Sequence, residues 1–225
     1  MIAALFDCDG TLYTGQFGRG LMRYAALNGH GLQSRLLYAS LIPSVTLRRM
    51  RLLSGAESDR IIMVGLARLL RGWDQHDLQA AFAWLVTEYL FPTRRPEIMA
   101  KLREHQAQGH AVVLVSGSFQ GALDVMTRSL GVAGGVGTKL DMVDGYCAGV
   151  IIPPLIKDEH KVTGARIFFV ARQQEIDWAA SYAYADSISD KDMLNMVGHP
   201  VAVYPDRELT KLAKDKGWEI IGTPR

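Results

Sequence analysis

The sequence of 225 residues is long enough for one large domain, or for one domain that carries a smaller insertion. Hydrophobic residues make up 48% and charged residues 21%, which excludes a disordered chain. The net charge of +2 gives no reason to expect a nucleic-acid partner. Two cysteines, Cys8 and Cys147, are too few for a disulfide scaffold, and the six histidines form no zinc-binding motif.

The predicted elements begin with a short buried strand at Ile2–Phe6, which ends at an acidic turn. From about residue 17 to residue 91 the apolar residues recur at helical spacing, and Asp74 is a suitable N-cap for one of the helices. A break at Phe91–Pro96 follows, and Pro96 suits the first turn of a new helix that ends at Gly109.

The second half of the sequence alternates between strands and helices. Ala111–Val115 is a predicted strand, and Ser116–Ser118 is expected to open a helix that extends to Leu130. Further along we expect a hairpin over 136–152 that turns at Asp144-Gly145, a helix over 161–175, strands at Tyr182–Ala185 and Val201–Tyr204, and a helix at Glu208–Lys216. This order predicts an α/β fold in which a Rossmann-like parallel sheet carries an inserted α-helical cap.

Charge supports the same division. Residues 14–95 contain eleven arginines, no lysine and five acidic residues, whereas the remainder of the sequence has more acidic than basic residues. We therefore expect a core formed by residues 1–13 and 96–225, with a helical cap at 14–95 inserted between them.

The absence of a basic stretch at the start argues against a signal peptide, so we expect a cytoplasmic protein. The most apolar stretch, Leu36–Val45, is shorter than the roughly 20 residues that span a bilayer. Arg48, Arg49 and Arg51 follow it, and such a pairing can rest on an anionic membrane surface. We favour packing inside the cap, because short apolar runs usually belong to cores, and keep membrane contact as the alternative.

The first candidate site is Asp7-Cys-Asp9-Gly10-Thr11, directly after the first strand. Two carboxylates held two residues apart can have different roles: one attacks the substrate or binds a metal, while the other transfers a proton. A calcium loop also uses this pattern, but the later acidic positions of such a loop are missing here.

The second candidate site is Ser116 with Gly117, placed after the second strand, where a hydroxyl and backbone N–H groups can hold an anion. The third is Lys161, a fixed cation for a buried phosphate, with Lys157 as the competing lysine. Each of these two sites also has a simpler interpretation, as a helix cap and as a surface charge respectively.

The fourth candidate site is Asp186-Ser-Ile-Ser-Asp190, after the strand Tyr182–Ala185. With Asp7 and Asp9, these two carboxylates can bind Mg²⁺, which prefers oxygen ligands. Parallel sheets bind ligands at the carboxyl ends of their strands, so we expect the four sites to meet there.

These four motifs in this order resemble the haloacid dehalogenase (HAD) superfamily, and in particular its phosphoserine-phosphatase-like branch with a helical cap. The resemblance rests on the DxDGT motif at Asp7–Thr11, on Ser116 and Lys161, and on the DSxxD motif at Asp186–Asp190. It covers the segments on both sides of the cap and extends to His199–Asp206 and Lys216–Trp218.

The resemblance implies a mechanism. Asp7 would be the nucleophile that forms an aspartyl-phosphate, and Asp9 would be the acid and base. Mg²⁺ would be bound by Asp7, the backbone carbonyl of Asp9 and Asp186, with Asp190 on its water shell or orienting its ligands. The phosphoryl oxygens would be held by Thr11, Ser116 and Lys161, and by the backbone N–H groups of Cys8, Asp9 and Gly117.

The retained Asp9 favours a phosphatase, because dehalogenases of this superfamily lack the second aspartate. We therefore predict hydrolysis of a small-molecule phosphomonoester, and keep a phosphotransferase and a non-catalytic phosphate-binding protein as alternatives. Phosphoserine phosphatases place a glutamate nine residues after the nucleophile, whereas this sequence has Gln16, which argues against phosphoserine. Gln16, Arg19 and Arg23 are the candidate cap residues for binding substrate, and the sequence does not indicate an oligomeric state.

Overall fold

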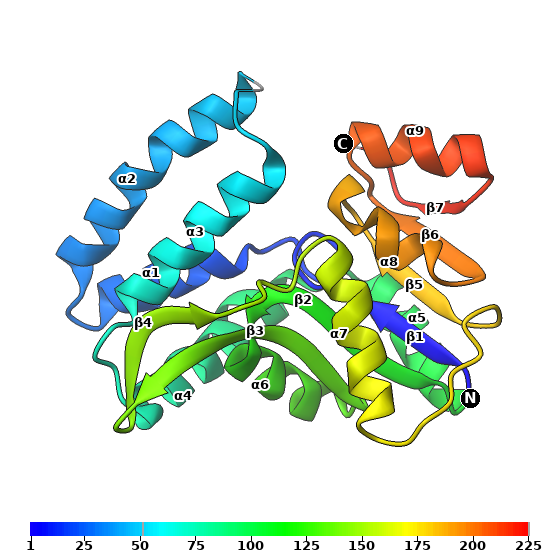
Figure 1. Ribbon diagram of the computed structural model, residues 1–225, viewed down its shortest axis with the longest axis horizontal. Coiled ribbons are helices and arrows are strands. Elements are labelled where there is room, and N and C mark those ends of the chain that lie inside the picture. Colours follow the sequence, from blue (N-terminus) through cyan, green and yellow to red (C-terminus); the bar gives the residue numbers. More distant parts are fainter. Residues whose placement is uncertain (51, 225) are drawn as a thin grey trace.

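The computed structural model describes residues 1–50 and 52–224, without the side chains of residues 45, 48 and 49. Its centre is a seven-stranded sheet in the order β4-β3-β2-β1-β5-β6-β7, and every pairing except β3–β4 is parallel. Figure 1 shows the sheet running across the molecule. Its strands are β1 Ala3–Phe6, β2 Ala111–Phe119, β3 Gly134–Val143, β4 Tyr146–Ile152, β5 Tyr182–Ala185, β6 His199–Val203 and β7 Glu219–Ile221.

Helices cover both faces of the sheet. Successive side chains of a strand point to opposite faces, so one strand contributes to the core on both sides. In β1, Ala3 and Leu5 belong to one buried cluster, and Ala4 and Phe6 belong to the other. One face packs against α7 Glu159–Val170, α8 Lys191–Asn195 and α9 Arg207–Lys216, and the other against α5 Pro96–Ala107 and α6 Gln120–Leu130. The predicted α/β class with a mostly parallel sheet is confirmed.

The segment between β1 and α5 is helical. It comprises α1 Phe17–Leu27, α2 Gly31–Arg49, α3 Gly55–Leu69, α4 Gln75–Trp84 and the π-helical turn Leu85–Leu90. In Figure 1, α2 and α3 form an arm that rises away from the sheet. Phe17, Leu66 and Phe82 from this segment share one hydrophobic cluster with Phe119 of β2, so the helices are anchored to the sheet by a continuous core.

Several local predictions are confirmed. The side chain of Asp74 caps α4 by accepting a hydrogen bond from the N–H of Asp77 at 2.8 Å. Pro96 is the first residue of α5, and strands β3 and β4 pair around a turn in which Asp144 and Gly145 have positive φ. A two-residue hairpin loop of this kind requires positive φ at both positions, which asparagine, aspartate and glycine tolerate.

The expected burial of Leu36–Val45 is wrong for part of that stretch. It lies in α2, where Leu41 and Ser44 are buried, but Leu36, Tyr38 and Ile42 are 61%, 58% and 54% exposed. The helix therefore has apolar residues on its outer face as well as on its inner one. Of the basic cluster that follows, Arg51 and the side chains of Arg48 and Arg49 lie outside the described residues. Among the described helices, none has both the length and the apolar character needed to cross a bilayer.

His105 of α5 links this helix to the central strands. Its Nδ1 lies 2.8 Å from Nδ1 of His110, and its Nε2 lies 2.8 Å from the hydroxyl of Tyr184 in β5. Burial, with a further contribution from His110, lowers the pKa of His105 from 6.5 to about 4. Two ring nitrogens at hydrogen-bond distance need one donor and one acceptor, so at least one of the two rings is neutral, and burial favours the neutral form of His105.

We expect this histidine to make stability depend on pH. The native state binds the proton more weakly than the unfolded chain, so the stabilisation is complete above pH 6.5 and is lost as the pH falls to about 4. The difference in unfolding free energy between the wild type and His105→Gln should therefore shrink by roughly 1–2 kcal/mol over that range in urea titrations. His76→Gln, at an exposed histidine, is the control. A difference that does not change with pH would contradict this account.

Candidate active site

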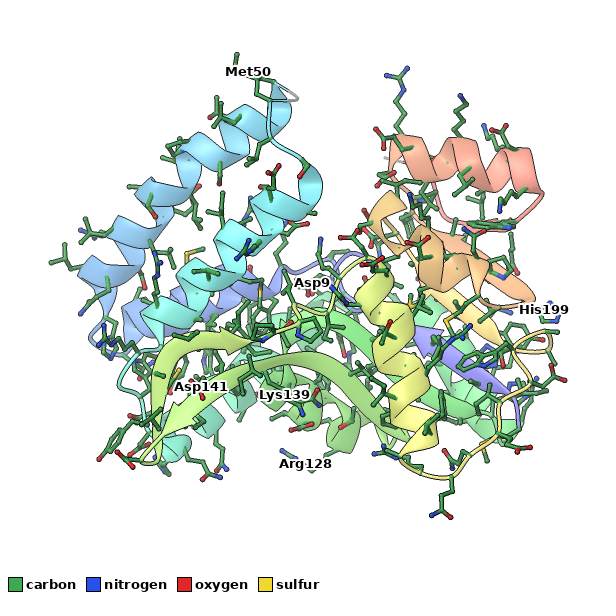
Figure 2. The ribbon with its side chains drawn as sticks, viewed as in Figure 1. Asp9, Met50, Arg128, Lys139, Asp141 and His199 are labelled. Atoms are coloured by element: carbon green, nitrogen blue, oxygen red, sulfur yellow. The ribbon has the colours of Figure 1, made fainter. Side chains whose placement is uncertain are left out.

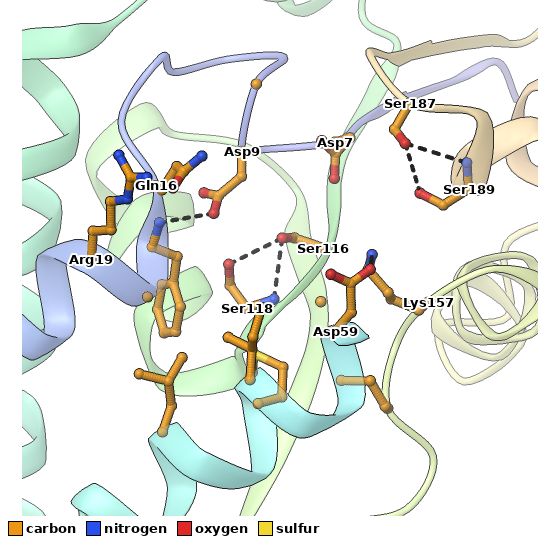
Figure 3. Close-up of a pocket in the computed structure, with 18 of the residues that line it drawn as sticks. Asp7, Asp9, Gln16, Arg19, Asp59, Ser116, Ser118, Lys157, Ser187 and Ser189 are labelled. Atoms are coloured by element: carbon orange, nitrogen blue, oxygen red, sulfur yellow. Dashed lines mark hydrogen bonds and ion pairs between the residues drawn. The ribbon is translucent and has the colours of Figure 1, made fainter. Parts of the chain in front are cut away.

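The predicted site residues lie at the carboxyl ends of three adjacent strands. Asp7 follows β1 directly, Asp186 follows β5 directly, and Ser116 lies near the end of β2. Lys161 reaches the same place from the first turn of α7. Figure 3 shows Asp7, Asp9 and Ser116 around one cavity, so the strand order brings together residues that are far apart in the sequence.

The centre of the site is a buried cation between two carboxylates. Nζ of Lys161 lies 2.7 Å from Oδ1 of Asp7 and 2.6 Å from Oδ1 of Asp190. All three side chains are buried. Burial alone would lower the pKa of Lys161, but the charges of Asp190 and Asp7 outweigh it and raise that pKa well above its usual value. Lys161 is thus held as a permanent cation, whereas Lys157, the competing lysine, pairs with Asp59.

Thr11 links the two halves of the acidic cluster. Its Oγ1 is fully buried and lies 3.1 Å from Oδ2 of Asp7 and 3.2 Å from Oδ1 of Asp186. A single hydroxyl hydrogen can be donated to only one of these oxygens at a time. The hydroxyl of Thr11 therefore lies between the carboxylates of Asp7 and Asp186 and connects them.

This cluster fits a hard divalent cation. The carboxylates of Asp7, Asp186 and Asp190 each offer an oxygen, and these atoms all lie within 4.8 Å of one another. Lys161 pairs with Asp7 and Asp190, and Asp186 adds a third buried carboxylate to the cluster. Oxygen ligands suit Mg²⁺ rather than a thiolate-binding or imidazole-binding metal.

Asp9 points into the same cavity. Its Oδ2 accepts a hydrogen bond from the N–H of Phe17 at 2.8 Å, whereas its Oδ1 is buried without a hydrogen-bond partner among the described residues. Burial raises the pKa of Asp9 to about 7; the Phe17 hydrogen bond opposes this rise, and the charges of Asp7 and Asp186 add to it. A carboxyl group of this pKa can both donate and accept a proton near neutral pH.

The prediction that Ser116–Ser118 open a helix is wrong, whereas the phosphate-binding role of Ser116 and Gly117 stays a prediction. Strand β2 continues through residues 116–118 to Phe119, which pairs with Thr138 of β3, and α6 begins only at Gln120. The pairing shifts register between Val115 and Phe119, so the strand is irregular where it borders the site. Ser116 Oγ accepts from the N–H of Ser118 at 3.2 Å, and Ser116 and Gly117 line the cavity from a strand end.

The cavity has a volume of about 650 Å³ and extends from the acidic cluster to the helical segment. Of the three candidate cap residues, Gln16 and Arg19 line it, and Figure 3 shows both near Asp9. Arg23 does not line it: with Arg19 and Arg35 it borders a second, more open hollow between α1 and α2. Arg23 is therefore not among the residues that line the cavity, although the two hollows share Arg19, Met22 and Tyr38.

Two contacts at the site were not predicted from the sequence. Asp59 of α3 forms an ion pair with Lys157, which joins the helical segment to the loop before α7 at the edge of the cavity. Nε of Arg95 donates a hydrogen bond to the carbonyl of Gly10 at 3.1 Å, and its guanidinium stacks 3.8 Å from the ring centre of Tyr204. The only sequence signal for Arg95 was its place at the start of α5.

A family model supports the same conclusion as the geometry. The model of haloacid dehalogenase-like hydrolases matches residues 4–195, which include all four motifs. The chain belongs to this family. As a HAD-like hydrolase it falls in the phosphoserine-phosphatase-like branch, and it is an enzyme of the HAD phosphatase type.

Individual relatives agree with this placement. The chain is 30% identical to a histidinol-phosphatase from Neisseria meningitidis over 166 residues, which cover 72% of this chain and 74% of the relative. It is 27% identical to a phosphoserine phosphatase from Mycobacterium tuberculosis over 225 residues, covering 97% and 70%. A solved Bordetella pertussis protein of unknown function has the same fold, with a TM-score of 0.82, 23% identity, and coverage of 98% and 97%.

Gly10 leaves room for the carboxylate of Asp186 beside the loop that follows β1. It has a φ of +87°, and a Cβ added there would lie 2.2 Å from Oδ2 of Asp186. We expect Gly10→Ala to lower the unfolding free energy by roughly 1–3 kcal/mol and to remove most phosphatase activity, because Asp186 must move. Gly109→Ala is the matched control: its φ is +74° with nothing within 4 Å, so it should lower stability but keep activity. Equal activity in the two variants, measured beside thermal unfolding, would contradict this explanation.

Proposed function

We propose that the enzyme hydrolyses a small-molecule phosphomonoester through an aspartyl-phosphate on Asp7. The observation that best supports this is the buried contact between Asp7, Lys161 and Asp190 at the carboxyl end of β1. A carboxylate can attack a phosphate dianion only where nearby positive charge reduces their repulsion. In this proposal residues 1–13 and 96–225 form the catalytic core, and residues 14–95 form the cap that contacts the leaving group.

The first step forms a bond between an oxygen of Asp7 and the phosphorus atom, and breaks the bond from phosphorus to the leaving alcohol. Asp9 donates its proton to the departing oxygen from Oδ1, which has no hydrogen-bond partner in the part of the chain that the structure describes, whereas Oδ2 accepts from the N–H of Phe17. In the second step Asp9 takes a proton from water, which attacks phosphorus, releases inorganic phosphate and restores Asp7. Lys161, Thr11, Ser116 and the backbone N–H of Gly117 hold the phosphoryl oxygens.

Mg²⁺ is the cofactor that this site fits. Asp7, Asp186 and Asp190 would bind it through their side chains or its water shell, and Asp9 through its backbone carbonyl. When bound, it supplies charge neutralisation for the phosphoryl group. Asp186 and Asp190 thereby serve to hold positive charge beside Asp7.

We expect Asp7→Asn to lower hydrolysis of p-nitrophenyl phosphate in Mg²⁺ buffer by about a thousandfold or more, because an amide is a poor nucleophile. The asparagine oxygen can still accept the hydrogen bond from Lys161, so the circular dichroism spectrum should not change. Release of inorganic phosphate is the readout, which also separates hydrolysis from transfer to an added alcohol.

Asp215→Asn, at an exposed aspartate of α9, is the control for removing a negative charge and should keep full activity. Full activity in Asp7→Asn would exclude Asp7 as the nucleophile. Transfer of the phosphoryl group to the added alcohol in preference to water would replace the hydrolase by a phosphotransferase.

Gln16 bears on the choice of substrate. It is the N-cap residue of α1, its side chain makes no capping hydrogen bond, and it lines the cavity near Asp9. Nearby, Arg19 is a cation and Asp59 is paired with Lys157. A substrate ammonium group would meet a neutral amide here, so phosphoserine fits this cap poorly.

We therefore expect phosphoserine to be hydrolysed with a lower kcat/KM than phosphate esters with an uncharged alcohol. Gln16→Glu should raise the kcat/KM for phosphoserine about tenfold relative to those esters, since it adds a charge-assisted contact to the ammonium. Gln16→Met, which also removes the amide but adds no charge, is the control. A wild-type preference for phosphoserine would contradict our interpretation of Gln16.

A further inference from the structure

The cavity changes character with distance from the acidic cluster. Asp7, Lys161 and Asp190 line its inner end. The lining of the cavity also includes Gln16, Arg19, Thr46 and the Asp59–Lys157 pair, and a group of aliphatic, thioether and aromatic side chains from three helices: Met22 of α1, Tyr38, Leu41 and Ile42 of α2, and Ile62 and Leu66 of α3. The cavity therefore has a charged inner end and a part lined mainly by these apolar side chains, which we call the passage.

The passage leads from the interior to the surface. Leu66 at its inner part is fully buried and Leu41 is 7% exposed, whereas Tyr38 and Ile42 on the outer part are 58% and 54% exposed. Its volume of about 650 Å³ is in the range of pockets that enclose drug-sized molecules, and exceeds what the phosphate of a short polar ester needs. The apolar side chains of this wall can bury a hydrocarbon chain.

The outer face of α2 gives a second, independent observation. Leu32, Leu36 and Leu47 of α2, and Met50 directly after the helix, are 70%, 61%, 39% and 63% exposed, so this part of the chain also has an apolar surface outside the cavity. Figure 2 shows Met50 at the tip of the α2–α3 arm. Exposed apolar surfaces of this kind mark sites where a protein binds apolar ligands, membranes or other proteins.

We propose that the substrate is an amphiphile: a phosphomonoester whose alcohol carries an unbranched hydrocarbon chain that lies between α2 and α3. This rests on the proposed phosphatase function and names the class of its leaving group. The phosphate lies at Asp7, the first carbons pass Gln16, and the chain contacts Ile62, Leu41 and Ile42 on its way to the surface. Transfer of each methylene from water to this wall favours binding.

The test is a series of alkyl phosphates from ethyl to decyl phosphate, each below its critical micelle concentration, with release of inorganic phosphate as the readout. The expected result is a rise in kcat/KM of about twofold to fourfold per methylene until the passage is filled. A flat series in which ethyl phosphate is hydrolysed as well as decyl phosphate overturns this inference and leaves the phosphatase function intact. No hydrolysis of any ester, including p-nitrophenyl phosphate, overturns both.

Two variants on the same helix locate the effect. Ile42→Asp places a charge in the passage and should lower the ratio of decyl to ethyl phosphate kcat/KM at least tenfold. Leu36→Asp is the matched control, since Leu36 is equally exposed on α2 but does not line the cavity, and should keep that ratio. Equal ratios in the two variants would contradict the passage. Because both positions are exposed, the folded state should persist, which thermal unfolding checks.

A second arm distinguishes a dissolved amphiphile from a membrane lipid. Dodecyl phosphate is offered in vesicles of phosphatidylcholine, with and without phosphatidylglycerol, and compared with decyl phosphate in solution. Hydrolysis in vesicles that falls in Leu36→Asp identifies the bilayer as the source, through the apolar face of α2. Hydrolysis in solution alone identifies a dissolved ester; both results support the class of leaving group, and hydrolysis in neither arm overturns it.

Discussion

The structure of the site depends on one buried cation. Lys161 lies between Asp7 and Asp190, and without its ammonium group these two carboxylates would face each other with little access to water. Removing one partner of such a buried group leaves an uncompensated charge, which typically costs about 3–5 kcal/mol. The positive charge that the proposed mechanism requires beside Asp7 is thus also needed by the folded protein, so in this proposal the catalytic and structural requirements coincide at Lys161.

Strand order explains why this cluster can form. The central strand β1 lies between β2 and β5, and the chain extends to one side through β2, β3 and β4 and to the other through β5, β6 and β7. The loops at the carboxyl ends therefore diverge around β1, which leaves a crevice where parallel sheets bind ligands. Gly10 completes the arrangement, because a side chain there would occupy the space of the Asp186 carboxylate. Arg95 holds the carbonyl of Gly10, and so connects the start of α5 to the geometry of this loop.

Sequence patterns predicted this sheet well, because buried strands and the acidic turns after them are local features. They failed at Ser116–Phe119, where pairing with β3 extends the strand beyond its apolar run. They also failed at Leu36 and Ile42, because an apolar residue on a helix shows its burial only once its neighbours are known. The Asp59–Lys157 pair was not foreseeable either, since it joins positions 98 residues apart.

The helices that line the cavity also differ in how extensively they pack against the hydrophobic core. Phe17 of α1 and Leu66 of α3 belong to the hydrophobic cluster that includes Phe119 of β2, whereas α2 contributes to it only Leu37 among the described side chains. Cooperative packing resists change in the first group, because a substitution there creates a cavity in a shared core. Residues of α2 can vary at lower cost to stability. In the proposed mechanism, leaving-group specificity is therefore set by the helix that the core constrains least, while the phosphoryl end of the cavity is fixed by the sheet.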